Sequence, residues 1–176
     1  LGLTIFVMLL GVIISFLPIS LKLRKLGYTF LCNLVMCMIA GLRSPLVGTE
    51  IVGYLRAIDY AKGNDFSLVV NYSEEPFHFE YGYLMLTAWF DIETMAFLFL
   101  IAFLVYVPTM IFYYRYSWDV AISLSCYCCF QFYGLSFSAV RQMVAISIVL
   151  LMIPHLLRRQ KWKWLVGIGG AMLFYI

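Results

Sequence analysis

The stretch Thr94–Tyr113 reads TMAFLFLIAFLVYVPTMIFY and contains no charged residue. A helix needs roughly 17–25 mostly apolar residues to cross a bilayer, so this stretch is long enough to span one. The whole chain has the same character, with 64% hydrophobic and 12% charged residues and a mean hydropathy of +0.95. Soluble domains carry about 25% charged residues. The composition therefore predicts a polytopic membrane protein and excludes a soluble globular domain.

Other apolar stretches flank this one along the chain. Together they predict an all-α fold of about six transmembrane helices, the remaining five being Leu1–Ser20, Leu26–Leu42, Trp118–Leu135, Phe137–Leu157 and Trp162–Ile176. We treat residues 1–176 as a single integral membrane domain. The chain begins without Met and stops inside an apolar run, so we expect it to be the N-terminal part of a longer protein.

Basic residues are concentrated in three of the connections. They are Lys22, Arg24 and Lys25, then Arg115, then Arg158, Arg159, Lys161 and Lys163. Cytoplasmic loops carry an excess of Lys and Arg, so these connections are predicted to be cytoplasmic. The connection 43–93, with eight acidic and three basic residues, is then extracytoplasmic. Short helices at the membrane surface are expected within it, over Glu50–Lys62 and from Phe79.

Arg141 is the most unusual residue of the apolar stretches. It lies about five residues, or ~7.5 Å of helical rise, inside the predicted outer turn at Gly134–Ser136. A guanidinium within a membrane helix costs a few kcal/mol and by default marks a functional site. Ser138 and Gln142 share its helix face and would form one polar wedge with it. The wedge predicts an anion site; the alternative is that Arg141 snorkels or pairs with an acid of the outer loop such as Glu80.

Arg43 follows the second apolar stretch on the same side of the membrane. Its simplest interpretation is an interfacial anchor for that helix. However, Gly41 precedes it and Ser44–Pro45 follows it, which predicts a bent backbone with free N–H groups. Two arginines from different helices at one outer mouth suit a diphosphate held at headgroup level. Such a ligand would be a lipid-linked diphosphate.

The outer connection also supplies the candidates for acid–base chemistry. These are Glu80, Glu50 and His78, each of which is more often a solvated loop residue than a catalyst. Aromatic neighbours surround Glu80, and burial among them would raise its pKa. Tyr54 and Tyr83 are candidates for stacking on sugars, although an interfacial aromatic belt explains such residues almost as well.

No motif of the chain indicates a metal or cofactor. The five cysteines lie in apolar runs, with no His near the Cys126–Cys129 group, and are interpreted as buried, inert thiols that form neither a disulfide nor a metal site. No Walker A loop, HExxH, GxSxG or DxD-type pair is present. We expect no cofactor, no metal and no nucleic acid partner.

Several short motifs, in their order and spacing, resemble the EpsG family of Wzy-type polysaccharide polymerases of bacterial envelopes. They are Gly41-Leu42-Arg43-Ser44, Gly48-Thr49-Glu50, Tyr54, Glu80-Tyr81-Gly82-Tyr83, Tyr133-Gly134, and Ala139-Val140-Arg141-Gln142 with Ala145. The resemblance covers about Leu26–Lys163. Glu50 stands where the family usually has Asp, which keeps the carboxylate but moves it by one methylene.

The resemblance implies an all-helical, GT-C-like glycosyltransferase of the bacterial cytoplasmic membrane that is inverting and metal-independent. A glycan on polyprenyl diphosphate would be transferred to a second lipid-linked repeat unit. Arg43 and Arg141 would hold the diphosphate, and Glu80 or Glu50 would orient or deprotonate the acceptor. The expected partners are the polyprenyl-diphosphate-linked oligosaccharide, the bilayer, and a chain-length regulator and flippase of the same pathway.

Two other functions remain open from the sequence. A flippase or other transporter of lipid-linked oligosaccharides would use the same arginines, but it should carry polar residues through the depth of several helices. A scaffolding subunit would bind a partner protein through the outer connection, but it leaves Arg141 without a role. The one-sided position of Arg141 favours an enzyme of the outer leaflet.

Overall fold

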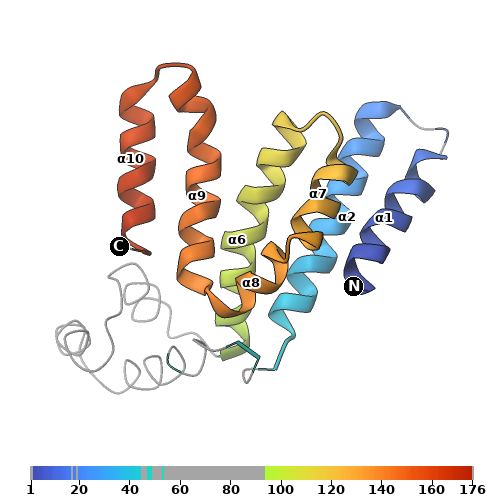
Figure 1. Cartoon of the computed structure of the whole chain (residues 1–176), viewed down its shortest axis with the longest axis horizontal. Helices are drawn as coiled ribbons and strands as arrows, with labels where there is room; N and C mark the ends of the chain where they lie inside the picture. The colour runs from blue at the N-terminus through green and yellow to red at the C-terminus, as the bar shows by residue number, and fades with distance from the viewer. Residues whose placement is uncertain are drawn as a thin grey trace.

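The computed structural model describes residues 2–16, 18, 20–44, 47, 48, 53 and 94–175. Its elements in that part of the chain are all α-helices (Figure 1), namely α1 (Gly2–Ser15), α2 (Leu21–Gly41), α6 (Thr94–Tyr116), α7 (Val120–Cys129), α8 (Phe132–Ser138), α9 (Val140–Leu157) and α10 (Lys161–Met172). The predicted all-α class is confirmed. The surface helices expected over 50–62 and from 79 fall, apart from Gly53, outside the described residues.

Three of these helices are long and apolar enough to cross a membrane: Leu21–Gly41, Met95–Tyr116 and Val140–Leu157. The pair α7 and α8 is bent by 52° and counts as a fourth span if it is taken as one broken helix. In Figure 1 the pair runs from the end where α6 finishes to the end where α9 begins. Both α1, with 14 residues, and α10, with 12, are shorter than a full span needs. The predicted count of about six is therefore not confirmed.

Several predicted helix boundaries are wrong. The second helix begins at Leu21 instead of Leu26, so three basic residues lie within its first turns. Long cationic side chains reach back to the interface from such positions, which makes the earlier start compatible with a bilayer. The predicted span Trp118–Leu135 breaks at Phe130–Gln131, where Gln131 adopts a left-handed conformation with φ 60°. No Gly or Pro marks this break in the sequence.

The start of α7 shows how the chain turns between spans. Asp119 is its N-cap residue, and one carboxylate oxygen, Oδ1, accepts hydrogen bonds from the backbone N–H groups of Ala121 at 2.7 Å and Ile122 at 3.2 Å. This satisfies two of the donors that a helix start leaves without an intrahelical partner. The cap fixes the turn Ser117–Asp119 between α6 and α7.

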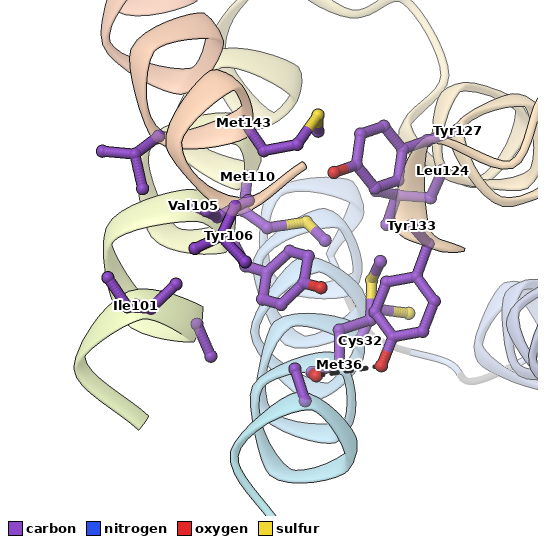
Figure 2. Packing of buried hydrophobic residues seen from close by; sticks show 14 of the residues in the cluster. Cys32, Met36, Ile101, Val105, Tyr106, Met110, Leu124, Tyr127, Tyr133 and Met143 are labelled. Atoms are coloured by element: carbon purple, nitrogen blue, oxygen red, sulfur yellow. Dashed lines mark hydrogen bonds between the residues drawn. The ribbon is translucent and has the colours of Figure 1, made fainter. Parts of the chain in front are cut away.

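The core lies where α2, α6, α7, α8 and α9 meet (Figure 2). Helix α6 packs against both α2 and α9, while α1 packs against α7 and α10 packs against α9. The most deeply buried large side chains include Met36, Phe97, Tyr106, Leu124 and Val144. Gly41 allows α2 to approach α6 closely, because a Cβ at this position would run into the ring of Phe99.

A proline inside α6 is compensated by α9. Pro108 has no N–H, so the carbonyl of Leu104 one turn earlier loses its helical donor. The buried hydroxyl of Ser147 on α9 donates to that carbonyl oxygen at 2.9 Å. An unpaired backbone group is costly in the membrane interior, so this bond helps a spanning helix to accommodate the proline. It also ties α6 to α9.

The three basic connections lie at one end of the bundle, which is the upper end in Figure 1. Two of them are joined directly, since Lys25 Nζ donates to the carbonyl oxygen of Ser117 at 3.0 Å. The end of α2 and the start of α9 lie at the opposite end. The charge distribution used in the sequence interpretation therefore corresponds to two distinct ends of the helix bundle.

Candidate functional site

The four candidates for diphosphate binding all lie at the end of the bundle opposite the basic connections (Figure 1). Arg43 follows α2 by two residues, Ser138 is the last residue of α8, and Arg141 and Gln142 lie in the first turn of α9. Arg43, Ser138 and Arg141 are half-buried and Gln142 is exposed. The other candidates fall outside the described residues: Glu50, Tyr54, His78, Glu80 and Tyr83.

Arg43 is held against α8 by an aromatic ring. Its guanidinium carbon Cζ lies 4.7 Å from the centre of the Phe137 ring, within the range of a cation–π contact. Burial lowers the pKa of Arg43 from its ordinary value. A guanidinium is so strongly basic that it stays charged in proteins. The loop after α2 therefore presents a permanent, partly desolvated cation next to α8.

Helix α8, which carries Phe137, is fixed in place by a buried relay of hydrogen bonds made by three hydroxyl groups. Tyr133 of α8 donates to the carbonyl oxygen of Met36 on α2 at 3.1 Å (Figure 2). Ser136 donates its only hydroxyl hydrogen to the carbonyl oxygen of Tyr133 at 2.6 Å. Tyr106 of α6, at 2.5 Å from Ser136 Oγ, must then be the donor of that bond. These contacts hold α8, and with it Phe137, against both α2 and α6.

A small cavity of about 10 Å³ separates Arg43 from Tyr106 and Ser136, with apolar residues of α2 and α6 completing its walls. This is space for about one water molecule and is far too small for a phosphate group. A diphosphate at Arg43 would therefore bind on the outward side of the guanidinium. The inner side faces the buried hydroxyl relay.

The sequence reasoning missed Phe137, Ser136 and Tyr106 as parts of this site. Tyr106 gave a signal, because a buried tyrosine in an otherwise apolar span usually needs a hydrogen-bond partner for its hydroxyl group. The contact between Arg43 and Phe137 gave none, since the two residues are far apart in the sequence.

The predicted polar wedge on one continuous helix is wrong. Ala139 has φ −96° and ψ 60°, outside the helical region, and separates α8 from α9. Ser138 and Arg141 therefore belong to different helices and do not have i, i+3 geometry. The turn predicted at Gly134–Ser136 is also wrong, since those residues lie within α8.

The break gives Arg141 a different setting from the predicted one. Arg141 is the second residue of α9, so its position is at a helix start and not five residues inside a helix. The bond from Met143 N to Ala139 O, at 3.0 Å, closes the first turn. The backbone N–H groups of the first turn of a helix, together with the helix dipole, favour an anion. Arg141 adds a fixed charge at the same place.

The thiols differ in part from their predicted burial. All five cysteines are free, and Cys32 is buried, whereas Cys126 and Cys129 are exposed on α7. The prediction of buried thiols is therefore wrong for these two residues. Within the described ranges, no three His, Cys, Asp or Glu side chains cluster as metal ligands would.

A family of known proteins matches this chain over most of its length. The model of the EpsG family matches residues 25–175, which covers both arginines and the break between α8 and α9. No curated protein and no solved structure matches the chain. The match spans most of the 176 residues, and the chain therefore belongs to the EpsG family, a family of Wzy-like polymerases.

Proposed function

We propose that this protein is a membrane glycosyltransferase that polymerises polyprenyl-diphosphate-linked oligosaccharide repeat units into surface polysaccharide. The reaction takes place at the outer leaflet of the bacterial cytoplasmic membrane. One observation carries the proposal: Arg43, packed on α8, and Arg141, in the first turn of α9, lie at the same end of the bundle. Membership of a polymerase family supports the reaction class.

The two arginines supply what a diphosphate leaving group requires. The acceptor hydroxyl oxygen forms a bond to the anomeric carbon of the donor while the bond from that carbon to the diphosphate oxygen breaks. Negative charge grows on the leaving diphosphate, and cations already in place stabilise it without reorganisation. Attack from the face opposite the leaving group inverts the anomeric carbon and needs no metal ion when guanidinium groups carry the charge.

The hydroxyl proton goes to a carboxylate of the outer connection, for which Glu80 and Glu50 are the candidates, with His78 as a further group. Ser138 and Gln142 add hydrogen bonds to the diphosphate, and Tyr54 and Tyr83 stack on sugar rings. A chain-length regulator and a flippase of the same pathway complete the assembly, and the membrane domain has a GT-C-like fold.

The proposed orientation follows from charge. The helix ends and turns at the upper end of Figure 1 carry Lys25, Arg115 and Arg158, with their basic neighbours. They belong on the cytoplasmic side by the positive-inside tendency. The arginine site at the other end then faces the outer leaflet. Lipid-linked repeat units present their diphosphate at this level of the membrane.

The test is the length distribution of the polymer in a deletion strain that carries variants of the intact gene. Arg141→Ala and Arg141→Lys should both abolish long chains at normal protein levels, because Lys keeps the charge but loses the planar fork. Arg158→Ala, at the opposite end of the bundle, is the matched control and should leave the length distribution unchanged.

Two outcomes would contradict the proposal. Normal chain lengths in Arg141→Ala would remove the arginine site from the mechanism. Repeat units retained on the cytoplasmic face in the deletion strain would indicate a flippase, whereas single repeat units accumulating on the lipid carrier at the outer face are expected for a polymerase.

A further inference from the structure

A second hollow lies at the basic end of the bundle, away from the two arginines of the proposed active site. It has a volume of about 470 Å³ and lies between α1, the start of α2 and the start of α7. Cavities of about 300–1,000 Å³ are the usual size for bound small molecules. Part of its wall precedes the family match over residues 25–175, because Gly11, Ile14 and Arg24 contribute to it.

The inner wall of this cleft is apolar. Ile14 and Ala121 line it, and Tyr28 contributes its ring while its hydroxyl donates to the carbonyl oxygen of Val7 at 2.9 Å. The polar tip of Tyr28 is therefore already satisfied within the protein. Gly11 keeps α1 close to α7, because a Cβ there would lie 3.0 Å from the Cβ of Ala121. A hydrocarbon chain fits such a wall better than a hydrated anion does.

The rim of the cleft is cationic. Arg24 and Lys25 lie half-buried on the first turn of α2. Lys25 is oriented by its bond to Ser117 O at 3.0 Å and lies 5.6 Å from the centre of the Tyr114 ring. Its ammonium group has three donors, so it can donate to a phosphate oxygen in addition to Ser117 O.

One acid, Asp119, also lines the rim, beside the two cations Arg24 and Lys25. Asp119 Oδ1 accepts from two backbone N–H groups at the positive end of α7. Trp118, next to it, is fully exposed and lines the same cleft. Tryptophan is enriched where a membrane protein passes through the headgroup level. The rim therefore combines a net positive charge with an interfacial aromatic ring.

We propose that this cleft binds one phospholipid with an anionic headgroup. The phosphate lies against Arg24 and Lys25, and the first part of an acyl chain lies along the α1 and α7 wall. This assignment uses no residue of the proposed diphosphate site, so it stands or falls independently of the proposed function.

Native mass spectrometry of the intact, detergent-solubilised protein tests the proposal. Phosphatidylglycerol and phosphatidylcholine with identical acyl chains are titrated separately, and glycerol 3-phosphate and inorganic phosphate are titrated as soluble sources of the same anion. We expect one phosphatidylglycerol to remain bound at concentrations where phosphatidylcholine does not. Each rim cation contributes about fivefold in affinity, so Arg24→Gln should weaken phosphatidylglycerol binding about fivefold.

The matched control is Lys22→Gln. Lys22 lies on the same turn of α2 and is exposed, but it does not line the cleft. Its replacement removes the same charge from the same surface and should change the affinity less than about twofold. Arg24→Lys should retain most of the binding, and this variant separates loss of charge from loss of folding.

Three results would overturn the proposal. Equal weakening by Arg24→Gln and Lys22→Gln would show a diffuse surface attraction and no site. Equal retention of phosphatidylcholine would show that the rim charges do not select the headgroup. Binding of glycerol 3-phosphate or inorganic phosphate as tight as that of the lipid would identify a soluble anion as the ligand.

Discussion

The hydrogen bond from Ser147 on α9 to the Leu104 carbonyl on α6 gives a testable prediction, because its contribution to stability depends on Pro108. Ser147→Ala removes the hydroxyl that donates to the Leu104 carbonyl at 2.9 Å. In the native chain Pro108 cannot replace that donor, so the carbonyl is left unpaired inside the bundle. In a Pro108→Ala background the new N–H of residue 108 supplies the helical bond. The same substitution should therefore be costly in one background and mild in the other.

The size of the expected stability loss depends on what happens to the two carbonyl acceptors of Ser147, those of Leu104 and Val144, when the hydroxyl is removed. The single hydroxyl hydrogen of Ser147 is shared between Leu104 O and Val144 O, the latter at 2.8 Å, but the Val144 carbonyl belongs to a regular turn of α9 and keeps its helical donor. Side-chain hydrogen bonds in membranes average about 0.6 and reach about 1.7 kcal/mol. Because the Leu104 carbonyl is orphaned, we expect Ser147→Ala to lower the free energy of unfolding by about 1.5 kcal/mol. With Pro108→Ala the loss should fall to about 0.5 kcal/mol, a coupling of about 1 kcal/mol.

The assay is reversible unfolding of the purified protein in mixed micelles, followed by circular dichroism. The four members of the cycle are measured under identical lipid conditions. Equal losses for Ser147→Ala with and without Pro108 would refute the reasoning, since the hydroxyl would then not be substituting for the missing backbone donor. A larger loss in the Pro108→Ala background would refute it as well.

Two further predictions concern helix approach and the arginine site. Gly41→Ala should lower the free energy of unfolding by about 1–3 kcal/mol, because its Cβ runs into the Phe99 ring. The control is Gly27→Ala on the same helix, where a Cβ meets nothing within 4 Å, and it should not destabilise the protein. Equal effects of the two substitutions would contradict the close approach of α2 to α6. Phe137→Leu removes the ring at 4.7 Å from Arg43, a contact that contributes about 1 kcal/mol, so polymerisation measured as polymer per unit protein should fall about fivefold without loss of folding. Full activity of Phe137→Leu would show that the ring does not position the guanidinium.

Composition and the run Thr94–Tyr113 were sufficient to predict an all-α membrane protein, because transfer of apolar residues into lipid depends on local sequence. The positions of the basic residues also predicted which turns share an end of the bundle. Helix breaks were not predictable in the same way. The break at Gln131 has no Gly or Pro to mark it, and the one at Ala139 lies in a sequence that is compatible with a continuous helix. Tertiary contacts, such as the relay through Ser136, determine where these helices stop.

The candidate site was predictable only in its charges. Arg43 and Arg141 were recognisable because an arginine is costly near lipid, whatever its neighbours are. Phe137 and Tyr106 were not assigned to the site, because their roles depend on contacts between α2, α6 and α8. Pairing across such distances in the sequence follows from the packing of helices and not from any local pattern.

The anchors of α8 also determine when the site can form during synthesis. Its hydrogen bonds run to Met36 on α2 and Tyr106 on α6, and both helices precede α8 in the chain. At about 5–20 residues per second, residues 132–138 leave the ribosome within a few seconds of the end of α6. The surface formed by α2 and α6 is then already in the membrane, and Arg43 precedes its aromatic partner Phe137 in the order of synthesis. The contacts of this half of the arginine pair therefore involve only segments that leave the ribosome before α10 does.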